Sequence, residues 1–184
     1  MGCLQSSDAQ GEGSGGKSLL MLGLDGSGST TILYQIVTGK KLETIPTLSF
    51  NHEEIKYNGV EYQIYDIGGL DKLRPLWKQY SKEANGYVFV LDAADRGRAT
   101  VASQELQKFY SGEGTKKGAA NPDNPLLVYA NKQDLPDAMN AEEVEKLLDL
   151  ASLPVSAFKV FPCCGKTGEN LRAGLDWLTE VIKQ

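Results

Sequence analysis

Residues 19–31, with the sequence LLMLGLDGSGSTT, combine an apolar run, a glycine-rich turn and two threonines. A buried strand that feeds a helix through such a turn is the layout of a phosphate-binding P-loop, where backbone N–H groups face an anion. Ser29 stands where this motif carries lysine, so the sequence predicts a phosphate cradle without its fixed positive charge. Thr30 is placed to contact Mg²⁺. The expected cradle residues are Gly23, Asp25, Gly26, Ser27, Gly28, Ser29, Thr30 and Thr31.

A second glycine-rich run, residues 11–18, fits the P-loop consensus more closely but lacks its context. It follows polar residues instead of a strand, and it precedes the apolar run 19–22 instead of a helix. Gly/Ser-rich segments of this kind are typical of flexible linkers. We therefore interpret residues 1–17 as a flexible tether and residues 18–184 as one globular domain.

The motif Asp66-Ile67-Gly68-Gly69 ends an apolar run. A carboxylate at a strand end suits Mg²⁺ bound through water, and Gly69 is free to present its N–H to a γ-phosphate. A simple strand-terminating turn would explain this motif by itself. Its position after a P-loop favours the metal and phosphate interpretation.

The motif Asn131-Lys132-Gln133-Asp134 also follows an apolar run. The Asp134 carboxylate can accept hydrogens from N1–H and N2–H₂ of guanine, a donor pair that adenine lacks. Asn131 would tie neighbouring loops together, and the aliphatic stem of Lys132 would cover the face of the base. A polar loop is the alternative, but the order of the three motifs favours a guanine site.

These motifs must be positioned by strands and helices that alternate along the chain. Asn58-Gly59 joins two strand-like runs and predicts a type I′ hairpin, Gly39 is a natural helix C-cap, and Asn140 with Glu143 predicts a capping box. The expected strands cover residues 19–22, 50–57, 60–67, 87–91, 126–129 and 158–161, and helical patterns cover 32–37, 101–109, 144–148 and 171–182. The sequence predicts an α/β fold with a mostly parallel six-stranded sheet, one antiparallel strand, helices on both faces and ligand at the carboxyl ends of the strands.

Composition limits the function further. The chain has 184 residues and a net charge of −5, which suit one acidic domain and argue against nucleic-acid binding. Its three cysteines, two of them adjacent at Cys163 and Cys164, give no disulfide framework. No apolar run approaches the roughly 20 residues needed to span a bilayer. We expect a soluble intracellular domain, in which His52 is an exposed strand residue and residues 111–124 form a surface loop.

The first residues, Met1-Gly2-Cys3-Leu4-Gln5-Ser6, fit the N-myristoylation pattern, with Gly2 as the acceptor. Cys3 lies beside it and is a candidate for palmitoylation. Two acyl chains hold a protein stably at a membrane, whereas one holds it only marginally. An inert N-terminus that happens to begin Met-Gly is the alternative.

From about residue 18 to its C-terminus the chain resembles the ADP-ribosylation factor (Arf) family of small GTPases, and most closely the Arf-like members. The resemblance rests on GLDGSGSTTILYQ, TIPTLSFN, YDIGGLDKLRPLWKQY, YANKQDLPDAM and GLDWL. It implies a P-loop GTPase fold that binds GTP or GDP with Mg²⁺. It also implies exchange factors, activating factors and effector proteins as partners.

The resemblance assigns roles to further residues. Thr47 matches the threonine that meets Mg²⁺ and the γ-phosphate, so the implied metal set is Thr30, Thr47 and, through water, Asp66. The base loop is expected at Cys164, Gly165 and Lys166, with a backbone N–H toward guanine O6. The hydrophobic effector triad is expected at Phe50, Tyr65 and Tyr80, where Tyr65 replaces the usual tryptophan. In this family the hairpin over residues 50–66 moves in register to couple nucleotide state to the N-terminus.

Three departures from the family bear on function. Ser29 loses charge-assisted bonds of ~1.5–3 kcal/mol, which should lower nucleotide affinity by at least tenfold to a hundredfold. Leu70 replaces the glutamine that orients the attacking water, so hydrolysis should be very slow even though the other catalytic positions, Thr47 and Gly69, are kept. The tether lacks the amphipathic helix of many relatives.

Four hypotheses follow. The leading one is a guanine-nucleotide-binding, Arf-like switch that recruits effectors in vesicle trafficking, cytoplasmic and peripheral on membranes such as Golgi or endosomes. The alternatives are a nucleotide-free pseudo-GTPase scaffold and a GTPase whose missing groups come from a partner or a nearby side chain. A P-loop kinase of small molecules is the remotest, because NKQD has no role there.

Overall fold

The computed structural model describes residues 16–39, 50–112 and 118–183. Gly2, Cys3, Thr47, the P-loop-like run 11–15 and the middle of the loop 111–124 lie outside these ranges. The described residues form a six-stranded sheet in the order β2-β3-β1-β4-β5-β6. Only β2 and β3 pair antiparallel, while every other neighbouring pair is parallel. The predicted α/β class and sheet are confirmed.

The strands agree with the predicted apolar runs to within two residues, and the hairpin strands agree at both ends. They are β1 Lys17–Gly23, β2 Phe50–Tyr57, β3 Val60–Ile67, β4 Gly86–Asp92, β5 Leu126–Asn131 and β6 Phe158–Pro162. Asn58 and Gly59 both have positive φ, of 47° and 80°, which is the type I′ turn that the sequence predicts. The parallel strands all end at one edge of the sheet, where the three motifs follow them.

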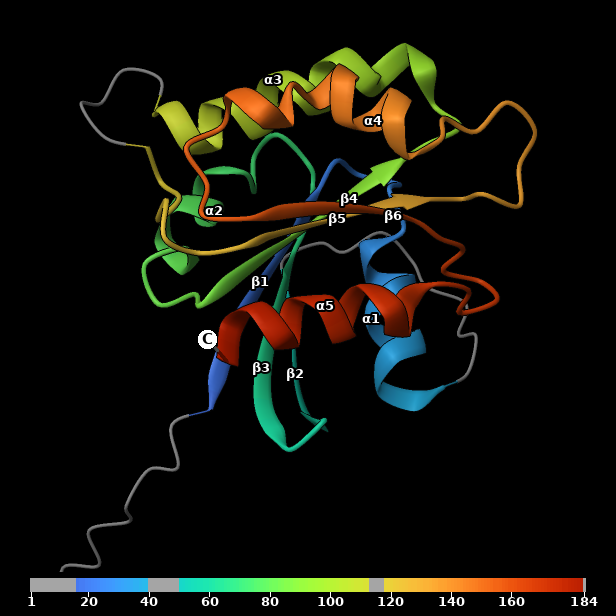
Figure 1. The fold of residues 1–184 in the computed structure, drawn as a ribbon. Helices are drawn as coiled ribbons and strands as arrows, with labels where there is room; N and C mark the ends of the chain where they lie inside the picture. The colour runs from blue at the N-terminus through green and yellow to red at the C-terminus, as the bar shows by residue number, and fades with distance from the viewer. Residues whose placement is uncertain (1–15, 40–49, 113–117, 184) are drawn as a thin grey trace, which may run out of the picture.

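The helices cover both faces of the sheet (Figure 1). They are α1 Ser29–Thr38, α2 Pro75–Tyr80, α3 Arg96–Ser111, α4 Ala141–Leu148 and α5 Leu171–Lys183. Helices α1 and α5 lie against one face, and α2, α3 and α4 lie against the other. Each face buries its own hydrophobic cluster, with Leu33 and Leu178 in the first and Trp77 and Leu106 in the second.

Local signals set several helix ends as predicted. Gly39 caps α1 with φ of 67°, and its N–H bonds to the carbonyl of Gln35. Asn140 and Glu143 form the capping box of α4. The periodicity missed α2 and the 3₁₀ turn Leu150–Ser152, because a helix of one or two turns is too short to show a 3.6-residue repeat. Within α3, Val101 is 39% exposed, so this apolar residue is not part of the core.

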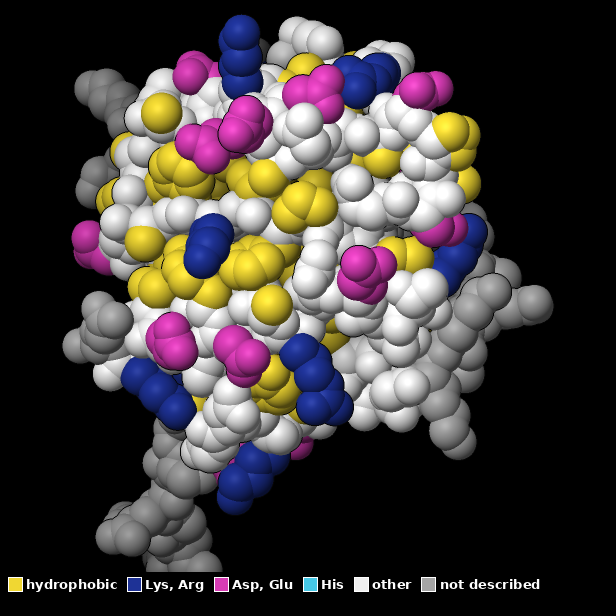
Figure 2. Space-filling model, turned by 45° about the vertical axis from the view of Figure 1, so that its right-hand side comes forward, with side chains coloured by type: hydrophobic (Ala, Val, Ile, Leu, Met, Phe, Trp, Pro, Cys, Tyr) yellow, Lys and Arg dark blue, Asp and Glu magenta, His cyan; other side chains and the backbone are white. Residues whose placement is uncertain are grey.

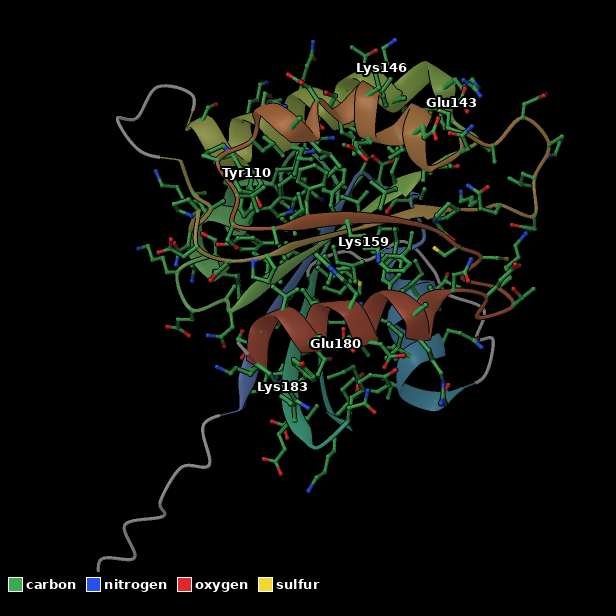
Figure 3. All side chains as sticks on the ribbon, viewed as in Figure 1. Tyr110, Glu143, Lys146, Lys159, Glu180 and Lys183 are labelled. Carbon is green, nitrogen blue, oxygen red and sulfur yellow. The ribbon has the colours of Figure 1, made fainter. Side chains whose placement is uncertain are left out.

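Hydrophobic side chains gather in a band across the face shown in Figure 2, with acidic side chains above and below it. On β6, Lys159 places its Nζ 5.1 Å from the ring centre of Phe161. Figure 3 shows Lys159 on β6, Tyr110 near the end of α3 and Lys183 at the end of α5. In the described part of the chain no helix has the length and apolarity to cross a bilayer. His52 is exposed on β2, as expected.

Candidate functional site

The turn after β1 has the geometry of an anion cradle. Gly28 precedes α1 with φ of 91°, and a side chain there would put its Cβ 2.4 Å from Nδ2 of Asn131. A Cβ on Gly23 would come equally close to the carbonyl of Val90, 2.4 Å away. Helix α1 begins at Ser29 after the glycine N-cap Gly28, which supplies no side-chain cap, and the N-terminus of a helix favours an anion. These features fit a phosphate group.

The P-loop has no lysine, and among the described residues a cationic side chain reaches it from α3. Arg98 donates from Nη1 to the carbonyl oxygen of Asp25 at 3.2 Å and to Oδ2 of the same residue at 3.1 Å. Asp95 orients this guanidinium, accepting from its Nε at 2.7 Å and from the Arg98 backbone N–H at 3.0 Å. These bonds lower the pKa of the Asp95 carboxyl and raise the pKa of Arg98. Arg98 therefore reaches the loop from a fixed position.

The proposed metal position is built around Asp66. Thr30 donates its hydroxyl to Asp66 Oδ2 at 2.6 Å, and Asn51 donates Nδ2 to the same oxygen at 3.1 Å. Asp66 is fully buried, and its other oxygen, Oδ1, has no hydrogen-bond partner among the described residues. A hydroxyl beside a buried carboxylate with a spare oxygen suits Mg²⁺ bound through water. The residues therefore fit a magnesium ion, with Thr47 outside the described ranges.

The segment after β3 folds directly onto the P-loop. A Cβ on Gly69 would lie 2.3 Å from the backbone N of Asp25, so only glycine permits this approach. Arg74 holds the segment by donating Nε to the Gly69 carbonyl at 3.0 Å, and it pairs with Asp71 at 2.6 Å and Glu105 at 3.5 Å. Leu70, next to Gly69, offers only an apolar side chain. It has no group that could orient a water molecule.

Asn131 joins the two loops in which the base site is expected. This buried side chain donates Nδ2 to the P-loop carbonyl of Ser27 at 2.8 Å, and its Oδ1 accepts the N–H of Gly165 at 2.8 Å. The phosphate loop and the base loop are thus joined through one amide. Lys132 pairs with Asp92 at 2.6 Å, which fixes the stem that was expected to cover a base.

Asp134, the expected guanine acceptor, is held by the base loop. Lys166 donates Nζ to its Oδ2 at 3.0 Å, and the thiol of Cys164 donates to Oδ1 at 3.5 Å. The bond from Lys166, followed by that from Cys164, lowers the pKa of the Asp134 carboxyl. Asp134 therefore stays ionised near neutral pH, which is the form that accepts two hydrogen bonds from a base edge. Cys163 and Cys164 are buried and free of disulfides.

The expected effector triad forms one aromatic cluster away from the base site. The ring centres of Phe50 and Tyr80 are 5.6 Å apart, and those of Tyr65 and Tyr80 are 5.3 Å apart. His52 stacks on Tyr65 at 4.6 Å and extends the cluster along β2. Phe50 is 43% exposed, so part of this apolar surface faces solvent.

Sequence reasoning missed three residues of the site, Asn51, Arg74 and Arg98. Asn51 lies beside the carboxylate of Asp66, Arg74 holds Gly69, and Arg98 holds Asp25. One local signal could have indicated Arg98. An aspartate followed three residues later by an arginine predicts that the aspartate caps the helix and forms an ion pair with the arginine. For Asn51 and Arg74 no local signal exists.

Comparison with known proteins places this geometry in a family. The sequence model of the ADP-ribosylation factor family matches residues 9–182. The Arl6 BBS3 small GTPase from Trypanosoma brucei, solved with the bound nucleotide analogue GppNp, is 31% identical with a TM-score of 0.79, over 92% of this chain and 98% of that one. The mammalian SRP receptor shares the fold at 21% identity and a TM-score of 0.76, over 90% of this chain and 100% of that one. The chain belongs to the ADP-ribosylation factor family of small GTPases.

Proposed function

We propose that this protein is an Arf-like switch that binds GTP and GDP with Mg²⁺ but hydrolyses GTP very slowly. The observation that carries the proposal is the amide of Asn131, which joins the carbonyl of Ser27 to the N–H of Gly165. A scaffold without nucleotide has no need to align a phosphate loop with a base loop. The relative from Trypanosoma brucei was solved with a GTP analogue, which supports the same ligand here.

Each part of the nucleotide has candidate partners in this proposal. The phosphates lie in the loop from Gly23 to Thr31, and the guanine edge bonds to Asp134 with the Gly165 N–H toward O6. Mg²⁺ is held by Thr30, Thr47 and, through water, Asp66, and it neutralises phosphate charge there. Gly69 presents its N–H to the terminal phosphate.

The slow hydrolysis follows from two side chains. Ser29 supplies no charge to the β- and γ-phosphates, and Leu70 orients no attacking water. Nucleotide exchange and effector binding would then govern the state of the switch more than hydrolysis does. Exchange factors and activating factors are the expected partners.

The output of the switch is proposed to be effector recruitment at a membrane. Exposed Phe50 with half-buried Tyr65 and Tyr80 supplies a partly exposed aromatic surface, and Gly2 with Cys3 fits a doubly acylated anchor. The proposed setting is the cytosolic face of membranes that take part in vesicle traffic. Labelling cells with myristate and palmitate analogues tests the anchor: the intact chain should take up both, G2A neither and C3S only myristate.

Calorimetric titration of the nucleotide-stripped protein with GTP and GDP, with and without Mg²⁺, tests the central proposal. We expect binding that is weaker than that of S29K and that requires Mg²⁺ for full affinity. No binding to a chain that is folded by circular dichroism would overturn the proposal. It would favour the second candidate, a pseudo-GTPase scaffold, for which the serine at position 29 is the supporting observation.

A further inference from the structure

The P-loop of this chain carries a negative charge of its own. Asp25 lies between Leu24 and Gly26, and a Cβ built on Gly69 would lie 2.3 Å from its backbone N, so the backbone of Asp25 packs directly against Gly69. Gly69 is the residue proposed to bond to the terminal phosphate, so a residue that carries a negative charge packs against the part of the site that would hold the most highly charged end of the nucleotide. In a P-loop with lysine this charge is offset within the loop. Here Ser29 offers nothing to offset it.

We propose that Arg98 of α3 is the residue that makes this lysine-free P-loop able to hold phosphates, by neutralising Asp25. The proposal rests on the proposed function, since it concerns how the same site binds its nucleotide. Arg98 acts through Asp25 and is therefore a positioning residue. Its two bonds to Asp25, to the carboxylate at 3.1 Å and to the carbonyl at 3.2 Å, hold both the charge and the backbone of the loop.

The guanidinium is well placed for this role. Asp95 caps α3 and binds Arg98 through both backbone and side chain, so bonds within the protein direct the arginine at the loop. A Cβ on Gly26 would lie 3.6 Å from the other terminal nitrogen, Nη2, so the guanidinium spans two consecutive P-loop residues. Arginine keeps its charge at all physiological pH values. The neutralisation of Asp25 by Arg98 therefore does not change across the physiological pH range.

A neighbouring arginine offers a matched control. Arg96 lies two residues earlier on α3 and is exposed like Arg98, but it bonds to the Asp137 carbonyl at 3.2 Å and pairs with Glu143 at 3.0 Å. R96Q removes the same charge from the same helix without touching the P-loop. Any general effect of net charge on nucleotide binding should appear in both variants.

A double-mutant cycle of R98Q and D25N, measured by fluorescent GTP and GDP binding, tests the proposal. We expect R98Q to weaken GTP binding about tenfold, and GDP binding less, because the uncovered carboxylate repels the more highly charged ligand more strongly. R96Q should stay within about twofold of the wild type. The D25N/R98Q double variant should return to within about twofold of D25N, and the R98Q defect should shrink at high salt.

Three results would overturn the proposal: wild-type affinity in R98Q, an equal loss in R96Q, or a loss that persists in the D25N background. The last would mean that Arg98 only shapes the loop. Urea unfolding of the nucleotide-free variants separates this role from a loss of stability.

Repeating the cycle in an S29K background keeps the two proposals apart. If the wild type binds nucleotide and R98Q matches it, this inference fails while the proposed function stands. If S29K binds nucleotide and the wild type does not, the proposed function fails together with the claim for the lysine-free loop, and the S29K cycle then tests only whether Arg98 neutralises Asp25. In the S29K background we expect each variant to change nucleotide affinity in the same direction but by a smaller factor, because the lysine supplies part of the positive charge. If neither form binds, both proposals are wrong.

Discussion

Two substitutions define this protein at the scale of single residues. Ser29 begins α1 inside an otherwise complete phosphate cradle, and Leu70 adjoins Gly69 where that glycine meets the P-loop. Neither disturbs the backbone, because Gly23, Gly28 and Gly69 keep their close approaches. The two substitutions therefore remove a positive charge and a water-orienting amide, and they leave the shape of the site unchanged. Nucleotide affinity and hydrolysis should respond to them separately.

Restoring the lysine should raise affinity. S29K adds charge-assisted hydrogen bonds to the phosphates worth ~1.5–3 kcal/mol, so its dissociation constants for GTP and GDP should fall by about tenfold to a hundredfold. Calorimetry of the nucleotide-stripped variant measures this change. S29A is the control, since it removes the hydroxyl without adding charge. Equal affinity in S29K and wild type would mean that a partner or another side chain already supplies the missing group.

Restoring the glutamine should raise turnover instead. We expect L70Q to speed single-turnover GTP hydrolysis by at least ~10-fold, because an amide can orient the attacking water, while nucleotide affinity stays nearly unchanged. Chromatographic assay of GDP formation with bound GTP measures this rate. L70M, which is also apolar and of similar size, should hydrolyse GTP as slowly as the wild type. A wild-type rate already typical of the family would contradict the role given to Leu70.

At the scale of elements, the pairing of β3 with β1 decides whether the metal position exists. Their register pairs Met21 with Asp66, and this alignment places the carboxylate beside the hydroxyl of Thr30. Contacts at the other end of the hairpin attach its turn to α5. Tyr57 donates its hydroxyl to Asp176 of α5 at 2.7 Å, and Lys183 donates to the carbonyl of Asn58 at 2.8 Å (Figure 3).

Tyr57 gives a test of this contact between hairpin and helix. Burial and the bond to Asp176 raise the pKa of Tyr57 from 10.0 to about 12, so its contribution is complete below pH 10 and is lost as the pH rises from about 10 to 12. Y57F should cost about 1 kcal/mol at pH 8. Its difference from the wild type should fall on going to pH 12, measured by urea unfolding at each pH.

The matched comparison for Y57F is Y34F, since Tyr34 is also a half-buried tyrosine, on α1. A difference between Y57F and wild type that stays constant from pH 8 to pH 12 would contradict the role of the Asp176 bond. Y34F controls for the loss of a tyrosine hydroxyl as such.

At the scale of the whole molecule, α5 is fitted tightly against strand β5 of the sheet. A Cβ on Gly174 would lie 2.6 Å from the ring of Tyr129, which is fully buried on β5. The hydroxyl of Tyr129 donates to the carbonyl of Leu171 at 2.6 Å, so the ring cannot move away without losing this bond. The core on this face therefore depends on a glycine within a helix.

G174A should destabilise the fold by about 1–3 kcal/mol, because the added methyl group forces either the helix or Tyr129 to shift. Urea unfolding of the nucleotide-free protein measures the loss. G97A is the control, since a Cβ there meets only Asp95 Oδ1 at 3.5 Å in the first turn of α3. It should be neutral or stabilise the protein by up to ~1 kcal/mol. Equal stability of the two variants would contradict the tight packing of α5.

The sequence by itself determined the sheet, the hairpin, the three motif loops and the missing lysine and glutamine. These are local features: glycine spacing, the Asn58-Gly59 turn and apolar runs depend on neighbours along the chain. The tertiary structure decided the contacts of Asp25 with Arg98, of Gly69 with Arg74 and of Asp134 with Lys166. The first and last of these join residues far apart in the chain, so they depend on strand order, register and helix placement. A sequence pattern records which side chains are present, and only the packed fold determines which charges meet.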